Sequence, residues 1–383
     1  MKKLYYEDSH MQAFTATVTG CTQVKKGWEV TLDATAFYPE GGGQPSDTGT
    51  LGEAKVLSVR EENDEIFHLC DKPLEVGSAV SGEIDWVRRF DLMQQHAGEH
   101  IVSGIIHSRY GWHNVGFHIG ADVITIDFDG PVPPEDLQEI ENAANTAIWQ
   151  DFPIKCWYPT QEELPTVPYR RKKDIPWPVR IVEFPGYDIC ACCGTHPKTT
   201  GAIGLVKLFS CVKFHEGVRI EMACGKRALD MLNTAYEQNK QVSQAFSAKL
   251  GETGLAAQRM NEALAAEKFR AAALEKQLFV QIARGYAGKE LALHFAEDLS
   301  PNSCRELCDA IADFAKIAVT LSGKDETGYC ICIVSRAENA KAIGDAAAKV
   351  LSGRGGGKKE AFQGRISATR GQIENFFVQN ENL

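Results

Sequence analysis

Residues 95–100 read Gln95-His-Ala-Gly-Glu-His100, and this stretch lies within an apolar pattern of helical period. The apolar positions around it are Leu92, Met93, Ile101 and Ile105. A separation of four residues on a helix places the imidazoles of His96 and His100 on one face, one turn apart. Such a pair on its own is more often an ordinary set of polar residues on a partly buried face. The stretch therefore predicts a helix with two candidate metal ligands that need further ligands from elsewhere in the chain.

The further ligands come from residues 190–196, which read Cys190-Ala-Cys-Cys-Gly-Thr-His196. Cys192 and His196 are also four residues apart, but Gly194 lies between them and favours a turn over a helix interior. Three imidazole nitrogens and one thiolate form the kind of tetrahedral set that zinc binds. The sequence therefore predicts one zinc ion with four protein ligands: His96, His100, Cys192 and His196.

Residues 96–100 also fit H-x-x-E-H, the motif of one class of zinc peptidases, in which Glu99 is the general base. A peptidase of this kind needs a carboxylate ligand later in the chain, and it leaves Cys192 and His196 without a role. The four-ligand site uses both stretches. It is therefore the preferred interpretation, and the peptidase is the alternative.

The composition is that of an ordinary globular protein, with 383 residues, of which 44% are hydrophobic and 24% charged. The residues after Lys2 and Lys3 do not form the apolar segment of a signal peptide, and no apolar run approaches the length of a bilayer crossing. We therefore expect a cytoplasmic protein that does not contact a membrane. Most of the 12 cysteines are expected to act as small hydrophobic residues, including Cys304, Cys308, Cys330 and Cys332.

Four segments differ in their periodicity, and together they indicate an α+β protein. Residues 1–88 alternate like strands and predict a small β-barrel or sandwich, whereas residues 89–224 mix helices with antiparallel strands around the two ligand stretches. Residues 225–287 are purely helical and predict a hairpin arm that turns at Gly251–Gly254. Residues 288–383 predict a compact α/β domain with a glycine-rich loop.

A glycine motif in the first segment places Gly41, Gly42 and Gly43 directly before Gln44. Three successive glycines indicate a backbone that takes positive φ or that a ligand approaches closely, and a plain wide turn is an equally good alternative. Gln44 is the one side chain of the motif that both donates and accepts hydrogen bonds through a planar amide. It is therefore a candidate for the functional site.

The net charge of −10 argues against a broad, non-specific nucleic-acid binder but allows a local basic surface. One basic run spans residues 169–173, near aromatic residues that offer stacking surfaces for unpaired bases. A second, residues 354–359, combines glycines with cations that can hold phosphate, although it lacks the spacing of a nucleotide-hydrolysing P-loop. Each run by itself is more typical of a solvated loop. The candidate cations are Arg170, Arg171, Lys172, Lys173, Arg354, Lys358 and Lys359.

Taken together, these motifs resemble those of the alanyl-tRNA editing proteins of the AlaX family, which are related to the editing domain of alanyl-tRNA synthetase. The matching parts are the run Phe37-Tyr-Pro-Glu-Gly-Gly-Gly-Gln-Pro45, the His96 and His100 pair, and Cys192 and His196 within C-x-G-T-H. The loop Gly353–Gly357 resembles that of the DHH-associated domain at the C-terminus of the synthetase. Their order and spacing span essentially the whole chain, which resembles the long form of the family.

The resemblance implies an ATP-independent, zinc-dependent hydrolase that cleaves the ester between tRNA(Ala) and a wrong amino acid, serine first and glycine second. It implies the four zinc ligands already named and an N-terminal β-barrel whose glycine motif lies near the catalytic cleft. The acceptor end of the tRNA is expected to contact the basic residues and the C-terminal domain, and a homodimer is expected through the helical arm or that domain. Two positions depart from the family: Glu99 stands where synthetase editing domains often have Thr, and Cys193 where Gly is common.

Four protein ligands usually close a structural zinc site, so catalysis needs a loosely held ligand, an expanded shell, or a zinc ion that only orients the substrate. In the last case Glu99 is the candidate base, with a solvated Glu99 as the alternative. Selection of serine over alanine needs buried polar groups that pair with the serine hydroxyl, for which Gln44 and Thr195 are candidates. The substrate pocket is expected to include Gly42, Gly43, Phe117 and His118. A non-catalytic tRNA-binding protein with a structural zinc is the remaining alternative.

Overall fold

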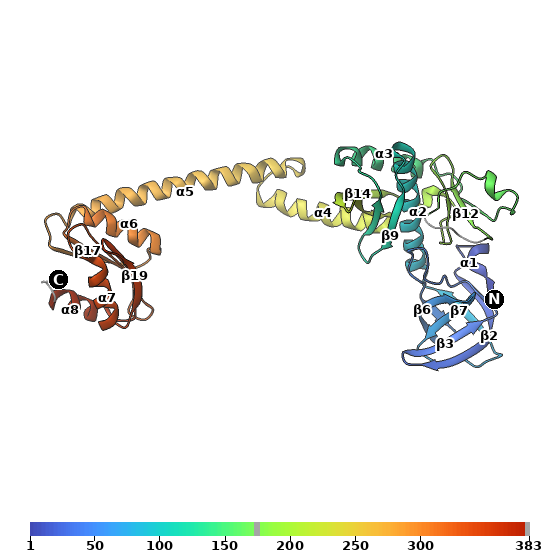
Figure 1. The fold of residues 1–383 in the computed structure, drawn as a ribbon, viewed down its shortest axis with the longest axis horizontal. Coiled ribbons are helices and arrows are strands. Elements are labelled where there is room, and N and C mark those ends of the chain that lie inside the picture. Colours follow the sequence, from blue (N-terminus) through green and yellow to red (C-terminus); the bar gives the residue numbers. More distant parts are fainter. Residues whose placement is uncertain (172–176, 380–383) are drawn as a thin grey trace. The chain divides into compact units, whose positions relative to one another are not determined.

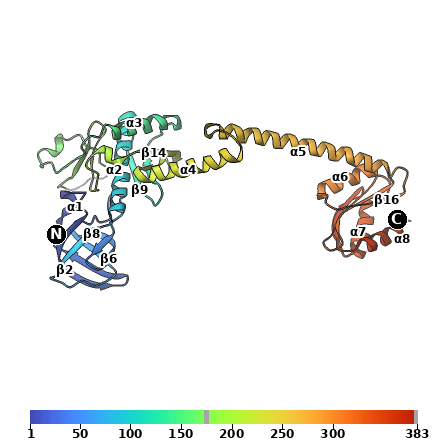
Figure 2. The ribbon, with the colours of Figure 1, turned by 180° about the vertical axis from the view of Figure 1, so that it is seen from behind.

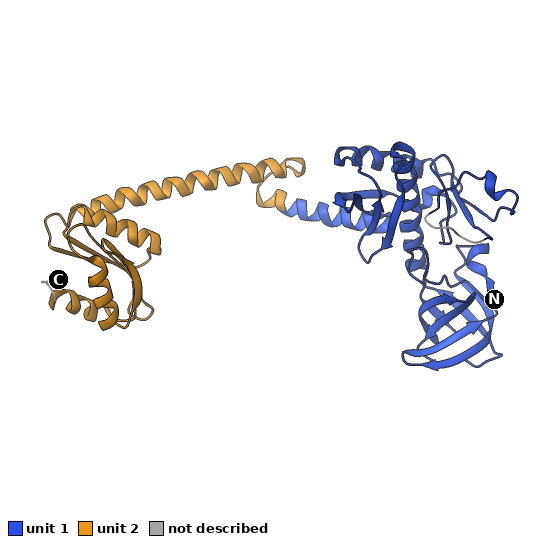
Figure 3. Cartoon of the chain, viewed as in Figure 1, with its two compact units in different colours: residues 1–241 blue, residues 242–383 orange. Residues whose placement is uncertain are grey.

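The computed structural model describes residues 1–171 and 177–379 and divides into two compact units, residues 1–241 and 242–383 (Figure 3). Helices and several separate sheets occur along the chain, which confirms the α+β class (Figure 1). Within the described residues, no helix combines the length and the hydrophobicity that a membrane crossing needs.

The first unit begins with six antiparallel strands that close into a barrel in the order β2-β3-β7-β6-β5-β8 (Figures 1 and 2). Their bounds are β2 (Ala13–Val24), β3 (Gly27–Leu32), β5 (Gly49–Leu51), β6 (Ala54–Glu62), β7 (Glu65–Cys70) and β8 (Ala79–Ile84). Outside the barrel, β1 (Lys2–Lys3) pairs in parallel with β4 (Ala34–Thr35), and α1 (Leu4–Glu7) follows β1. Along β2 the side chains alternate, and Phe14, Ala16 and Val18 point into the core. The sequence was compatible with either a barrel or a sandwich, and the closed ring of strands shows that the fold is a barrel.

The barrel leads directly into α2 (Trp86–Tyr110), the helix that carries the His pair. Asp85 caps its N-terminus by accepting a hydrogen bond from the backbone N–H of Arg88 at 3.1 Å. Gly111 ends it in the left-handed conformation, with φ of 80°. Most of the middle of the helix is buried, so α2 is the central element of this part of the chain.

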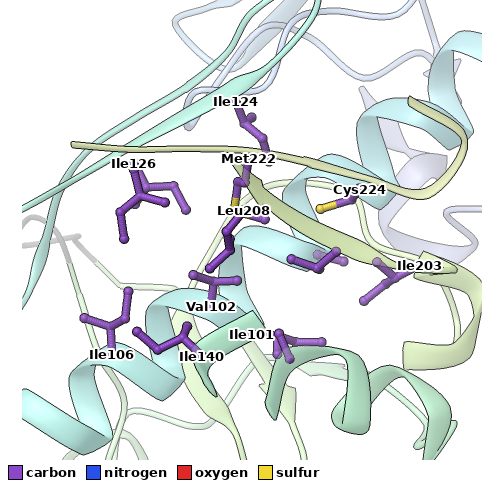
Figure 4. Packing of buried hydrophobic residues seen from close by; sticks show 14 of the residues in the cluster. Ile101, Val102, Ile106, Ile124, Ile126, Ile140, Ile203, Leu208, Met222 and Cys224 are labelled. Carbon is purple, nitrogen blue, oxygen red and sulfur yellow. The ribbon is translucent and has the colours of Figure 1, made fainter. Parts of the chain in front are cut away.

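A four-stranded antiparallel sheet packs against α2 in the order β14-β15-β10-β9. Its strands are β9 (Asn114–Ile119), β10 (Ile124–Phe128), β14 (Val206–Phe214) and β15 (Gly217–Cys224), and α3 (Leu137–Trp149) covers α2 and β14. Figure 4 shows Ile101, Val102 and Ile106 of α2 among the apolar side chains of the sheet and of α3. This packing fixes the rotation of α2 about its axis, because its apolar residues are committed to the core.

A second antiparallel sheet, in the order β11-β12-β13, leads to the cysteine turn. Its strands are β11 (Lys155–Trp157), β12 (Ile181–Phe184) and β13 (Asp188–Ala191). The described part of the unit also contains short 3-10 helices, η1 (Pro134–Asp136), η2 (Leu164–Thr166) and η3 (Thr200–Ile203). The predicted turn follows β13 directly, and β13 packs against α2.

The second unit contains a five-stranded sheet in the order β16-β17-β18-β20-β19. Its strands are β16 (Leu291–Ala296), β17 (Ile317–Lys324), β18 (Gly328–Ser335), β19 (Arg354–Lys358) and β20 (Ala361–Ile366), and its helices are α6 (Pro301–Ala312), α7 (Ala340–Val350) and α8 (Arg370–Gln379). The predicted glycine-rich loop is wrong over residues 354–358, because these residues form the edge strand β19. Glycine is needed at positions 355 and 357 because β20 is close: a Cβ atom on Gly357 would lie 2.0 Å from the carbonyl oxygen of Ala361.

The helical segment consists of α4 (Gly225–Ala245), η4 (Leu250–Glu252) and α5 (Thr253–Arg284). The interruption is close to its predicted place, but Gly254 lies in the first turn of α5 rather than between the helices. The division between the two units falls inside α4, so the predicted hairpin arm stays a prediction.

Candidate metal centre

Four side chains from two distant stretches meet at one buried point. Cys192 Sγ lies 3.4 Å from His96 Nε2 and 3.7 Å from His196 Nε2. Together with one nitrogen of His100, these donor atoms all lie within 4.8 Å of one another. The three histidines are at most 3% exposed, and Cys192 is half-buried. The structure thus brings together the four side chains that the sequence grouped as candidate ligands.

The two stretches approach closely because glycine leaves room between them. A Cβ atom on Gly194 would lie 2.2 Å from Cε1 of His96, so no larger residue fits at this position without a shift. Arg180 holds the turn by donating hydrogen bonds to the carbonyl oxygens of Cys192 and Gly194, at 2.9 and 3.0 Å. These two hydrogen bonds fix the backbone of the cysteine turn.

Two of the histidines are oriented by side chains behind them. His96 Nδ1 lies 2.8 Å from Gln44 Oε1, an acceptor, which leaves Nε2 of His96 free to face Cys192. His100 Nδ1 lies 2.9 Å from Asp188 Oδ2, and Arg170 donates to both oxygens of Asp188, at 2.7 and 2.8 Å. An acceptor on the far nitrogen of a histidine fixes its tautomer and is typical of metal sites.

The residues fit a metal ion on two further grounds. His100 Nε2 is buried without a hydrogen-bond partner, and a bound cation would satisfy it. Burial raises the pKa of Cys192, but the neighbouring His96, His100 and His196 lower it further than burial raises it, to well below its usual value. Burial lowers the pKa of His196 to about 3. A thiolate and a neutral imidazole are the forms that bind a metal.

His100 differs from His196 in its proton affinity. Burial lowers its pKa, but the charge of Cys192 and the hydrogen bond to Asp188 outweigh burial and raise it well above the usual value. The site therefore attracts a positive charge at this position, whether a proton or a metal ion.

The glycine motif forms a tight turn beside the cluster. Gly41 and Gln44 exchange backbone hydrogen bonds at 3.1 and 2.9 Å, and Gly42 and Gly43 have φ of 59° and 85°. A Cβ atom on Gly43 would lie 2.6 Å from Cδ1 of Phe117. The turn thus has the positive φ angles that were one of the open alternatives, and the close approach comes from Phe117.

Most of the expected pocket residues lie around this turn. Gln44 is buried and donates from Nε2 to Thr195 Oγ1 at 2.8 Å, and the ring of Phe117 lies 5.2 Å from that of His96. Gly42, Gly43 and Cys193 are exposed. His118 is exposed and follows Phe117 on strand β9, where successive side chains point to opposite faces. The structure therefore does not bring His118 to the cluster.

Glu99 is buried at 1% exposure, so the solvated alternative is wrong. Its carboxylate accepts a hydrogen bond from Ser103 Oγ at 2.7 Å and another from Asn114 Nδ2. It is not part of the group of donor atoms that meet at the cluster. The contacts of Glu99 thus connect α2 with β9.

The predicted basic residues fall into three groups. Arg170 is committed to Asp188, and its side chain is 13% exposed, so it supports the metal centre instead of forming an open cationic surface. Arg171, Arg354, Lys358 and Lys359 are exposed. Lys172 and Lys173 lie outside the described residues.

Sequence reasoning did not find the roles of Asp188 and Arg180. Asp188 is 88 residues from His100 in the chain, and Arg180 donates its hydrogen bonds to backbone oxygens of the turn. Neither residue belongs to a spacing pattern that would have distinguished it from other charged residues.

Two known families match parts of the chain. Class II (A) tRNA synthetases match over residues 2–88, and the second additional domain of threonyl and alanyl tRNA synthetases matches over residues 179–221. The second match contains Cys192 and His196, and it begins next to Arg180.

Whole sequences match over most of the chain. The alanine–tRNA ligase of Thermofilum pendens is 32% identical over 96% of this chain and 42% of that protein. The alanyl-tRNA editing protein Aarsd1 of Danio rerio is 25% identical over 96% of this chain and 95% of that protein. The alanyl-tRNA editing protein AlaX-L of Pyrococcus horikoshii is 32% identical over 61% of this chain and 60% of that protein. The chain thus spans less than half of the ligase but almost all of the Aarsd1 protein.

Among solved structures, the C-Ala domain of alanyl-tRNA synthetase from Aquifex aeolicus matches 24% of this chain and 91% of that domain. The sequence identity is 24% and the TM-score is 0.22.

Proposed function

Because this chain is a homologue of alanyl-tRNA editing proteins over 96% of its length, we propose that it is a trans-editing deacylase of mischarged tRNA(Ala). The observation that carries the proposal is the buried group of three imidazoles and one thiolate beside the glycine turn. Two of its four residues, Cys192 and His196, belong to the stretch that matches the second additional domain of threonyl and alanyl tRNA synthetases.

The donor set favours zinc as the metal ion, held by His96, His100, Cys192 and His196. Zinc binds nitrogen and sulfur donors in tetrahedral sites, and the Cys192 thiolate and the neutral imidazole of His196 are available here. When bound, zinc supplies a Lewis acid that polarises an ester carbonyl. The peptidase alternative lacks support, since Cys192 stands among the donors where that class needs a carboxylate.

Gln44 and Thr195 are the candidates for recognition of the serine side chain. Both are buried, they are hydrogen-bonded to each other, and Gln44 also contacts His96. A serine hydroxyl that enters this site can take part in these hydrogen bonds, whereas the methyl group of alanine can neither donate nor accept one. Sites built around buried polar groups reject the analogue that lacks the partner by factors on the order of 10⁴. This argument favours serine over glycine as the preferred substrate.

The tRNA is expected to contact exposed cations in both units, namely Arg171, Arg354, Lys358 and Lys359. The overall charge of −10 implies that such contacts are local, so binding should weaken with salt in proportion to a small number of phosphate contacts. Division into four domains at residues 88, 224 and 287 remains part of the proposal. So does a homodimer, for which α5 offers exposed apolar residues: Met260, Leu264, Phe269, Leu274 and Leu278.

The proposal is tested by one deacylation experiment on the metal-loaded chain. Its substrates are Ser-tRNA(Ala), Gly-tRNA(Ala) and Ala-tRNA(Ala), each with and without a chelator, and an unstructured peptide is the control for peptidase activity. Release of serine that is lost on chelation supports the proposal. A metal-loaded, folded protein that releases no amino acid would instead support a tRNA-binding protein with a structural metal.

The recognition of serine is tested separately with Thr195→Val. The variant removes one hydroxyl and keeps the shape of the side chain, so kcat/KM for Ser-tRNA(Ala) should fall by about tenfold or more while the metal content is unchanged. Thr200→Val is the matched control, because Thr200 is also buried but contacts the backbone of Ala147 and Phe152 instead. An equal loss in both variants would remove Thr195 from the recognition site.

A further inference from the structure

Four cysteines of the second unit lie together between α6 and the sheet. Cys304 and Cys308 are one turn apart on α6, and Cys330 and Cys332 are two residues apart on β18, so each pair shares one face of its element. All four belong to, or pack against, the same apolar cluster between α6 and the strands β17 and β18. From the sequence they were expected to act only as dispersed small hydrophobic residues.

The thiols are paired across the boundary between helix and strand. Cys330 is the thiol that most raises the pKa of Cys304, and Cys332 is the thiol that most raises the pKa of Cys308. The backbone contacts fix both helical thiols against the sheet. Cys304 Sγ lies 3.5 Å from the carbonyl oxygen of Thr320, and Cys308 Sγ lies 3.2 Å from that of Cys332. Two dithiol pairs therefore lie side by side.

The two pairs differ in their access to solvent. In one pair, Cys308 and Cys332 are both buried. In the other pair, Cys304 is buried but Cys330 is half-buried. In the sheet, Cys330 pairs directly with the exposed Arg365 of β20. An oxidant in solution can thus reach Cys330 but not the second pair.

The two thiols of the accessible pair, Cys304 and Cys330, also differ in pKa. The hydrogen bond from Cys304 lowers the pKa of Cys330 to about 7, with smaller contributions from Gln363 and Arg365. The same hydrogen bond and burial raise the pKa of Cys304. An accessible thiolate next to a buried thiol is the arrangement of an attacking cysteine and its resolving partner.

We propose that Cys304 and Cys330 form a reversible disulfide by exchange with a small disulfide such as oxidised glutathione. The Cys330 thiolate attacks one sulfur of the reagent, forms a mixed disulfide and releases one glutathione thiolate, which takes up a proton. Cys304 then gives up its proton and attacks the Cys330 sulfur, which forms the protein disulfide and releases the second glutathione. Two protein thiols are oxidised, and one glutathione disulfide is reduced to two thiols. The new bond joins α6 to β18.

The experiment treats the full-length, metal-loaded chain with oxidised glutathione, blocks the remaining thiols and maps the peptides by mass spectrometry. The expected product links the Cys304 and Cys330 peptides, is reversed by reduced glutathione, and carries no stable glutathione adduct. The initial rate of Cys330 loss should rise with pH about a midpoint near 7, the value for that thiol. Cys156, which is exposed in the first unit, reports that the reagent is active.

Two variants separate the roles of the cysteines. Cys304→Ser should accumulate a glutathione adduct on Cys330, and Cys330→Ser should leave Cys304 unreacted. The buried pair Cys308 and Cys332 is the internal control and should stay reduced. The proposal is overturned if the wild-type chain keeps glutathione on Cys330, if both thiols stay reduced while Cys156 reacts, or if Cys308 and Cys332 are the residues that become linked. The mapping of the wild-type chain decides even where a variant does not fold.

Discussion

Two buried histidines of the first unit, His68 and His100, lie in different environments, and of these two only His100 is a candidate metal ligand. His68 lies inside the barrel at 0% exposure, and both of its ring nitrogens are paired, Nε2 with Thr35 Oγ1 at 2.8 Å and Nδ1 with the carbonyl oxygen of Val30 at 3.0 Å. His100 lies in the metal centre at 3% exposure, and only its Nδ1 is paired, with Asp188. Its Nε2 has no hydrogen-bond partner and faces the thiolate of Cys192.

The proton affinities of the two histidines move in opposite directions. Burial lowers the pKa of His68 to about 4, so His68 stays neutral. Burial also lowers the pKa of His100, but Cys192 and Asp188 outweigh burial and raise this pKa well above its usual value. Burial of a histidine therefore does not identify a metal ligand. The distinguishing features are an unpaired ring nitrogen and negative groups around it.

The largest effect is expected from removal of the thiolate at the metal centre. Cys192→Ala, or chelation of the metal, should lower the rate of Ser-tRNA(Ala) deacylation by about a thousandfold or more, because the carbonyl loses several kcal/mol of Lewis-acid stabilisation. Single-turnover deacylation together with metal analysis checks this. Cys211→Ala is the matched control, since Cys211 is a half-buried cysteine outside the centre. Full activity of metal-free Cys192→Ala would contradict a metal-dependent reaction.

The barrel histidine, His68, should make the stability of the barrel depend on pH. The folded state holds the pKa of His68 at about 4, whereas the unfolded chain has about 6.5, so the unfolded state binds more protons between these values. His68 therefore destabilises the barrel as pH falls from 6.5 to 4, by about 3 kcal/mol in the free energy of unfolding. Amide hydrogen exchange in β3 and β7, corrected for the pH dependence of the intrinsic exchange rates, measures this loss of stability.

His68→Gln should remove this pH-dependent component, and His118→Gln, at an exposed histidine, should leave it unchanged. If the wild-type chain and His68→Gln lose barrel protection in parallel between pH 6.5 and 4, then His68 is not the group responsible.

A smaller change tests the group behind His100. Asp188→Asn keeps the shape of the side chain but removes the charge that holds both His100 and Arg170, so the metal should bind about 10 to 100 times more weakly. Competition with a chelator measures this affinity without reference to activity. Asp127→Asn is the matched control, because Asp127 forms a similar pair with Arg219 away from the centre. An unchanged affinity in Asp188→Asn would mean that Asp188 only braces the fold.

The smallest effect on the reaction is expected at Glu99, whose carboxylate is held by Ser103 and Asn114. Glu99→Gln should change deacylation by less than about tenfold and lower the free energy of unfolding by about 1–3 kcal/mol, since a buried charge-assisted contact is lost. Rate and urea unfolding are measured on the same metal-loaded sample. A loss of 100-fold or more with metal and stability retained would instead establish Glu99 as the general base.

Local sequence patterns predicted the α+β class, the helix of the His pair and the turn of Cys192 and His196, because helical period, glycine content and ligand spacing act over a few residues. The same patterns failed where a residue's role depends on a distant partner. Arg170 was predicted as a surface cation but pairs with Asp188, and residues 354–358 were predicted as a loop but form the edge strand of a sheet.

The amino-acid order establishes which chemical groups are present: three imidazoles and a thiolate at spacings that suit one metal ion, and a glycine run able to form a tight turn. Tertiary structure alone decided which nitrogen of each histidine is free, where Glu99 points, and that two cysteines of α6 meet two of β18. The physical reason is that hydrogen-bond partners and burial are set by contacts between segments far apart in the chain, such as the 88 residues between His100 and Asp188.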